Sequence, residues 1–390
     1  MPDLSGLQPE PVDRTGHLGK YYMSFKTLFA GPRVGDFHGR DNNFNLIRFS
    51  AATMVIWTHA FGLLRHTEFE PVHRIFGIGA GDLGVDIFFI LSGFLVSKSL
   101  NGKIIIQFAW ARFLRIYPGL WAATLISVLV VAVFFTNMSA GRFLINPSTL
   151  AYVLHNATLL PGLGARLALP HTFHYRNDLF NVALWTLPYE LQMYGLLALL
   201  SVSLGLRVRY LGLIAASGAL SVLMAKIDGL HLLEVDSGRF LYLFFVGSLM
   251  YALRARIALR GWIAATGAGL IVLTIALTEN QNARQVVLLA VLPYLLLWCG
   301  LIPGGWLRYW NRLGDYSYGM YIYACPVQIA LIATGVTSTP ARNFIFSMLI
   351  TAPFSVGSWH LLEKRVLHKQ LPGFLAFPLL RRARARSLSE

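Results

Sequence analysis

Residues 44–64 read FNLIRFSAATMVIWTHAFGLL, and residues 83–100 read LGVDIFFILSGFLVSKSL. Each run is close to the roughly 20 mostly apolar residues that a helix needs to cross the hydrocarbon core of a bilayer. Each run also contains ionisable side chains: Arg48 and His59 in the first, Asp86 in the second. Such groups are costly inside a membrane and usually face a cavity or a partner. The two runs therefore predict membrane helices that carry a polar site.

The composition of the whole chain agrees with a membrane protein. Of its 390 residues, 55% are hydrophobic and 13% are charged, whereas about 25% of the residues of a soluble domain are charged. We expect an all-α, polytopic integral membrane protein with about ten transmembrane helices around a central channel. The apolar runs are Phe44–Leu64, Leu83–Leu100, Ile116–Phe135, Leu184–Leu204, Tyr210–Ala225, Phe240–Leu253, Trp262–Thr278, Val286–Leu301, Ser317–Ala333 and Phe344–Leu362.

The basic residues predict the orientation of the bundle. With both termini on one side, that side holds about 23 lysines and arginines and the other about 7, and the richer side is normally cytoplasmic. The net charge of +15 then reflects this bias and contact with anionic lipids, so no nucleic-acid partner is expected. Residues 1–43, which lack a signal-peptide core, are expected to be a cytosolic tail with a short interfacial helix at Tyr21–Phe29. Residues 44–366 then form the membrane domain, and residues 367–390 form a basic cytosolic tail.

Arg48 and His59 are placed to act together. At about 100° and 1.5 Å per residue, they share one face of a helix and lie about 16 Å apart along its axis. A guanidinium suits a phosphate, and the pantetheine arm of coenzyme A has this length scale. A donor whose phosphates are held at Arg48 would thus present its thioester near His59. The alternatives are that Arg48 snorkels to lipid phosphates and that His59 is a structural, hydrogen-bonded side chain.

Asp86 and Glu190 are the acidic candidates for the same site. Counted from the outer ends of their helices, His59, Asp86 and Glu190 fall within about 5 Å of a common depth. An imidazole beside a carboxylate is a general-base arrangement. The sequence leaves open which carboxylate would pair with His59, and whether Asp86 and Glu190 form only an interhelical clamp.

The segment Phe108–Pro118, FAWARFLRIYP, places Arg112 and Arg115 on one helical face at the inner end of the third span. Together with Arg48 they form a candidate clamp for a nucleotide's charged end; the alternative is simple anchoring at the inner surface. The glycines of Gly79–Phe94 permit either an unwound segment at Gly93 or close helix packing.

The outer segment from Thr136 to Ala183 is long enough to cover an acceptor site or to be a plain connector. It contains His171 and His174, whose spacing would suit a metal ligand pair. No cluster of carboxylates or cysteines completes such a site, so we expect no metal.

Six motifs, taken together and in this order, resemble the acyltransferase-3 family of bacterial membrane O-acyltransferases, close to its branch that modifies exopolysaccharide and O-antigen. They are NFNLIRFSAATMVIWTH (43–59), GVDIFFILSGFLV (84–96), ARFLRIYP (111–118), LWTLPYELQMY (184–194), LGDYSYGMYIYACPV (313–327) and LLEKRV (361–366). The resemblance covers almost all of the chain after the tail. It departs from the family at Ala324, where many members have a histidine before the proline.

The resemblance implies transfer of an acyl group, commonly acetyl, from cytosolic acyl-CoA to a hydroxyl of a cell-surface or lipid-linked glycan. It implies a multi-pass protein of the bacterial inner membrane. It assigns His59 as catalytic base or acyl carrier, Arg48, Arg112 and Arg115 to the donor, and Glu190 to the region of the acceptor; Asp86 remains a candidate partner of His59. Acyl-CoA would be a co-substrate, and the glycan and membrane lipids the remaining partners.

Two other functions remain open at this point. A transporter or flippase for a glycan or lipid would line its path with the same polar residues, but no internal repeat supports it. A purely structural subunit of an export complex would have little use for buried ionisable groups.

Overall fold

The computed structural model describes residues 31–37, 39, 41–101, 104–134, 136, 138–159, 181–204, 206–227, 235–367 and 369. Within these ranges the regular structure is helical, apart from one antiparallel bridge between Arg33 and Ala258. The expected helix at Tyr21–Phe29 and the pair His171 and His174 lie outside the described residues.

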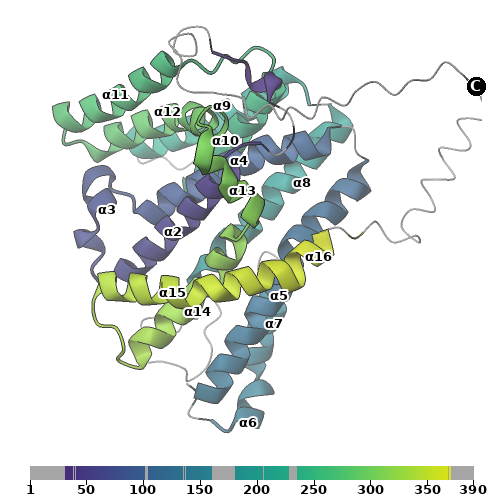
Figure 1. Ribbon diagram of the computed structural model, residues 1–390, viewed down its shortest axis with the longest axis vertical. Coiled ribbons are helices and arrows are strands. Elements are labelled where there is room, and N and C mark those ends of the chain that lie inside the picture. The colour runs from purple at the N-terminus through teal and green to yellow at the C-terminus, as the bar shows by residue number, and fades with distance from the viewer. Residues whose placement is uncertain are drawn as a thin grey trace, which may run out of the picture.

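The helices follow the apolar runs of the sequence (Figure 1). The α-helices are α2 (Phe44–Leu63), α3 (Pro71–Phe76), α4 (Ala80–Leu100), α5 (Ile105–Phe134), α6 (Ala140–Leu144), α7 (Pro147–Thr158), α8 (Leu187–Ser203), α9 (Val208–Ile227), α10 (Val235–Ala252), α11 (Gly261–Leu277), α12 (Gln281–Leu301), α13 (Trp310–Leu313), α14 (Ser317–Ala333), α15 (Pro340–Ser358) and α16 (Lys364–Leu367). A π-helical turn, Trp359–Glu363, joins α15 to α16. Short 3-10 turns are Val34–Asp36, Thr67–Phe69, Val182–Thr186 and Gly305–Tyr309.

The protein is a multi-pass membrane protein. Among the described residues, six helices are long and apolar enough to cross a bilayer, and α11 and α14 are shorter apolar helices. One boundary differs clearly from the sequence expectation: α5 begins at Ile105 rather than Ile116 and continues through Pro118. The apolar run begins after Arg112 and Arg115, but Arg115 is paired with acidic side chains and lies inside the helix.

Helix α4 lies between α2 and α10 (Figure 1). A Cβ atom on Gly93 would lie 1.9 Å from the carbonyl oxygen of Phe244, and one on Gly247 would lie 2.1 Å from that of Ile90. Gly84 approaches the carbonyl of Ala51 in the same way on the α2 side. Because α4 is unbroken from Ala80 to Leu100, close packing accounts for Gly93, and no unwound segment is present.

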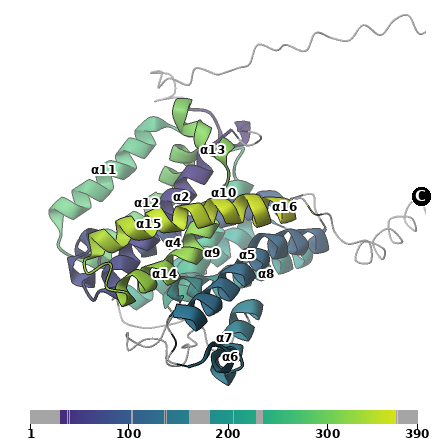
Figure 2. The ribbon, with the colours of Figure 1, turned by 60° about the horizontal axis from the view of Figure 1, so that its bottom comes forward.

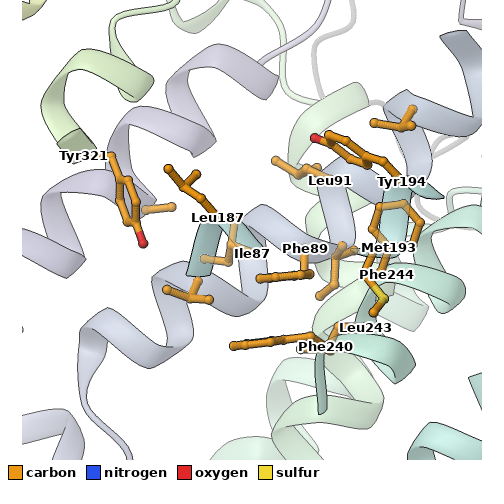
Figure 3. Close-up of a cluster of buried hydrophobic side chains, with 14 of the residues drawn as sticks. Ile87, Phe89, Leu91, Leu187, Met193, Tyr194, Phe240, Leu243, Phe244 and Tyr321 are labelled. Carbon is orange, nitrogen blue, oxygen red and sulfur yellow. The ribbon is translucent and has the colours of Figure 1, made fainter. Parts of the chain in front are cut away.

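Aromatic side chains fill the space between α4, α8 and α10 (Figure 3). The rings of Phe89 and Phe240 stack with centroids 4.1 Å apart, and Tyr194 packs at 6.0 Å from Phe244. These contacts fix α8 beside α4 and thereby position the polar residues that the two helices share.

Helices α14 and α15 close the other side of α2, and the π-helical turn and α16 that follow α15 contact α5 (Figure 2). The fully buried Gln328 of α14 donates to the carbonyl of Ile56 in α2 at 2.8 Å and to Asn343 of α15 at 3.1 Å. The turn after α15 carries Glu363 to α5, where its carboxylate lies 3.8 Å from Arg115. Thus residues from both ends of the chain meet at the start of α5.

Replacing Gly93 by alanine should destabilise the fold. The added methyl group would overlap the backbone of α10, and overpacking of this kind costs about 1–3 kcal/mol. We expect a lower melting temperature in detergent for Gly93→Ala. Gly195→Ala is the matched control, because no atom lies within 4 Å of its added Cβ. Equal losses of melting temperature in the two variants would contradict the packing explanation.

Candidate functional site

A narrow cavity of about 70 Å³ lies where α2, α4, α5, α8 and α14 converge. Its wall combines apolar side chains with charged and hydroxyl groups. The polar side chains are Arg48, Ser92, Arg112, Arg115, Thr186, Glu190, Tyr194, Ser317, Tyr318 and Tyr321. The close-up in Figure 3 shows Tyr194, Leu187 and Tyr321 of this wall, which come from α8 and α14. Such a mixture, inside a membrane protein, suits a bound polar molecule.

Two of the cavity's arginines share one carboxylate. Asp315, just before α14, lies 2.9 Å from Nη1 of Arg48 and 2.6 Å from Nη2 of Arg115, and it also accepts a hydrogen bond from Ser317. Burial would raise the pKa of Asp315, but the charges of Arg115 and Arg48 outweigh it and lower that pKa to about 2. Asp315 is thus ionised, and it fixes both guanidinium groups at the cavity wall.

Arg112 has a different environment. Among the described residues no carboxylate pairs with it, and its guanidinium carbon lies 5.8 Å from the ring centre of Tyr194. Its Nε atom is buried and lacks an acceptor. A buried donor without an acceptor is costly, so Arg112 is the cavity cation best placed to bind an anion that enters.

Glu190 lies in the first turn of α8 and faces the same cavity. Its Oε1 accepts hydrogen bonds from the hydroxyl groups of Ser92, at 3.2 Å, and Tyr194. Ser92 belongs to α4, so this hydrogen bond joins α4 to α8. The carboxylate therefore lies in a hydroxyl-lined wall, where it can accept a hydrogen bond from a substrate hydroxyl.

Asp86 does not line the cavity. It is fully buried, and its Oδ2 lies 2.6 Å from Nη2 of Arg239 in α10. Among the described residues, no hydrogen bond joins Asp86 or Glu190 to His59. The observed contact of Asp86 corresponds to an interhelical clamp, the alternative that the sequence left open.

His59 is half-buried and also lies outside the lining of this cavity. Because α2 is unbroken between Phe44 and Leu63, His59 lies about 16 Å from Arg48 along the helix axis. Asp82 lies about one turn before Asp86, at the start of α4. Next to His59, the hydroxyl of Thr58 donates to buried Glu70 at 3.0 Å and accepts from the backbone of Gly81 at 2.6 Å, which ties α2 to the start of α4.

Sequence reasoning missed the residues that pair with the site's charges. Asp315 and Glu363 lie inside two of the quoted motifs. An acidic residue at a helix boundary, in a site that holds several arginines, was the sequence feature that could have identified them as ion-pair partners. Arg239 stands immediately before an apolar run, and the boundary drawn at Phe240 excluded it. Asp82 lies in the first turn of α4, where a carboxylate is often only a helix cap, and it accepts a hydrogen bond from the backbone N–H of Gly79 at 2.8 Å.

Fold and site together define the class of protein: a multi-pass membrane protein with a buried cavity that combines arginines, a carboxylate and hydroxyl groups. The acyltransferase domain model of the acyltransferase-3 family matches residues 41–360. The chain belongs to this family and is a membrane acyltransferase, which also decides against transport as its function.

Two curated relatives are similar over most of the chain. An O-acetyl transferase of Shigella phage Sf6 is 28% identical over 362 residues, which cover 85% of this chain and 98% of the relative. Nodulation protein 10 of Rhizobium leguminosarum bv. viciae is 29% identical over 339 residues, which cover 78% of this chain and 88% of the relative. No solved structure gives a significant match.

Proposed function

We propose that this protein transfers an acetyl group from cytosolic acetyl-CoA to a hydroxyl group of a cell-surface or lipid-linked glycan. The carrying observation is the convergence of Arg48, Arg112, Arg115 and Glu190 on one buried cavity. The similarity to an O-acetyl transferase supports acetyl as the transferred group. In this proposal the protein lies in a bacterial inner membrane, with both termini in the cytoplasm. Residues 44–366 form its membrane domain, which has about ten membrane helices around a central passage.

Arg112 binds the diphosphate of the donor. Of the three arginines that line the cavity, Arg112 is the one for which the described residues provide no carboxylate partner, whereas Arg48 and Arg115 are held by Asp315. Those two guanidinium groups shape the wall, and Asp315 and Glu363 balance their charge. A guanidinium gives charge-assisted, forked hydrogen bonds to phosphate oxygens. With the phosphates there, the slim pantetheine arm extends along α2 and brings the thioester toward His59.

His59 acts on the acceptor hydroxyl. In the direct route the imidazole takes the hydroxyl proton while the oxygen attacks the thioester carbon. The carbon–sulfur bond then breaks, and the coenzyme A thiolate takes the proton from the imidazolium, leaving an O-ester and free thiol. In the alternative route an imidazole nitrogen attacks the thioester carbon and coenzyme A leaves as its thiol with the proton of that nitrogen; the acceptor oxygen then attacks the acetyl-imidazole, and its proton returns to the released imidazole. Asp82 stabilises the imidazolium, because the charge of Asp86 is balanced by Arg239, and Glu190 accepts a hydrogen bond from the acceptor.

Arg112→Ala should weaken the binding of acetyl-CoA by about tenfold or more, because a charge-assisted contact is worth roughly 1.5–3 kcal/mol. Equilibrium binding of labelled acetyl-CoA to the protein in nanodiscs measures this. The control is Arg209→Ala, since Arg209 is exposed at the start of α9 and does not line the cavity. Unchanged affinity in Arg112→Ala would remove Arg112 from the donor site.

The function itself is tested on cells. Mass spectrometry of cell-surface glycans should show O-acetyl groups that disappear when the gene is deleted and return with the wild-type gene but not with His59→Ala. Identical glycans in all four strains would contradict the proposal.

A further inference from the structure

A second cavity, of about 270 Å³, lies at the C-terminal ends of α4, α10 and α12 and beside the start of α2. One wall is the segment that precedes α2, which we call the N-terminal strap: residues 31–43 as far as they are described. Phe37, Asp41 and Asn42 of the strap line the cavity.

The strap is fastened at both ends, so the cavity is part of the folded structure. At its first end, the backbone of Val34 donates to Ile257 at 3.0 Å and that of Gly35 to Arg254 at 2.8 Å. At its second end, Asn43 is buried, and its backbone and side chain donate to carbonyl groups at the end of α12, at 2.8–3.1 Å. Between these anchors, Phe37, Asp41 and Asn42 line the cavity.

The cavity combines aromatic walls with cations. The ring centre of Phe94 lies 5.9 Å from that of Phe44 and 5.7 Å from that of Tyr251, and all three rings are buried. Lys98 is exposed and has no ion-pair partner among the described residues, while Arg254 lies over Tyr251 with its carbon 4.3 Å from the ring centre. The acidic lining residue, Asp41, is already paired with Arg308. The free charge on the wall is therefore positive.

The second cavity lies along the same helical faces as the first. On α2, Phe44 lines the second cavity and Arg48 lines the first, one turn and about 6 Å further along the helix. On α4, Leu95 lines the second cavity and Ser92 the first. Because the two helices run in opposite directions, both place the second cavity beyond the Arg48 end of the first.

We propose that this second cavity binds the 3′-phosphoadenosine end of the acyl-CoA donor, an inference that rests on the proposed function. The first cavity, at about 70 Å³, admits a slim chain but not a nucleotide, whereas the second approaches the roughly 300 Å³ of small ligand sites. The aromatic walls contact the adenine, and Lys98 and Arg254 bind the 3′-phosphate. The donor then runs from the strap past Arg112 toward His59.

The test compares acetyl-CoA with 3′-dephospho-acetyl-CoA, which lacks only the phosphate assigned to Lys98 and Arg254. In nanodiscs of phosphatidylcholine, wild-type protein should bind acetyl-CoA about tenfold more tightly. Lys98→Ala and Arg254→Ala should each reduce this preference toward onefold, because each should weaken the binding of acetyl-CoA and leave the binding of the dephospho donor unchanged. Arg256→Ala is the control, because Arg256 is exposed two residues from Arg254 and does not line the cavity. Arg112→Ala should weaken the binding of both donors and leave the preference for acetyl-CoA unchanged.

Three results would overturn the inference. They are a wild-type protein that binds both donors equally, a preference that survives in Lys98→Ala and Arg254→Ala, and, in nanodiscs that also contain phosphatidylglycerol, a loss of bound phosphatidylglycerol in these variants with the donor preference unchanged. The last would assign the cavity to an anionic lipid. Wild-type protein that binds neither donor would instead contradict the proposed function. Lys98 is exposed, so its replacement leaves the packing of the fold intact.

Discussion

Replacing His59 by alanine should abolish acetyl transfer while leaving acetyl-CoA binding nearly unchanged. A positioned general base accelerates transfer by about 10²–10⁴-fold, and loss of an acyl carrier would remove the reaction altogether. Donor binding should survive, because His59 lies about 16 Å from Arg48 along an unbroken helix and does not line the cavity of the arginines. The two measurements are the rate of transfer to a glycan acceptor and the affinity for labelled acetyl-CoA.

The matched control for His59→Ala is His66→Ala. His66 is exposed just beyond the end of α2 and packs on Phe69, so its loss should leave transfer unchanged. Transfer at the wild-type rate in His59→Ala would exclude His59 from the mechanism. A covalent acetyl-imidazole trapped on wild-type protein would decide between the two routes in favour of the carrier.

Replacing Asp315 by alanine should cost about 3–5 kcal/mol of stability, the usual result of removing one partner from a buried ion pair. Asp315 is 7% exposed and holds both Arg48 and Arg115; without it Arg48 would have no ion-pair partner among the described residues, and Arg115 would keep only the 3.8 Å contact with Glu363. We expect a large drop in melting temperature and the loss of acetyl-CoA binding. The double variant Asp315→Ala with Arg48→Ala should recover part of the stability, since one unpaired charge is then removed. A double variant no more stable than Asp315→Ala would contradict this coupling.

The same ion pairs predict a pH dependence. Because the pKa of Asp315 is lowered to about 2 from 3.8, its contribution to stability is complete above about pH 4–5 and is lost as the pH falls from about 4 to 2. Between pH 5 and 7, the difference in unfolding free energy between wild-type protein and Asp315→Ala should therefore be constant. A difference that declines between pH 7 and 5 would mean that Asp315 titrates there.

The apolar runs and the charge bias of the chain were enough to recognise a multi-pass helical membrane protein, and six ordered motifs were enough to recognise its family. Hydrophobic length is a local property, and the runs from Phe44 and Leu83 lie on α2 and α4 almost residue for residue. The 16 Å between Arg48 and His59 likewise needs only helical periodicity, which is fixed by the backbone.

The partners of the charged groups had to come from the folded chain. Arg48 is bound by Asp315, Asp86 by Arg239, and Glu190 by Ser92, and each of these pairs joins helices far apart in the sequence. Depth counted along separate helices placed His59, Asp86 and Glu190 at one level, but depth does not tell which way each side chain points around its helix. That direction follows from how α4 packs between α2 and α10, where glycine backbones set the distance, so only the tertiary structure separates an arginine free to bind a donor from one already neutralised.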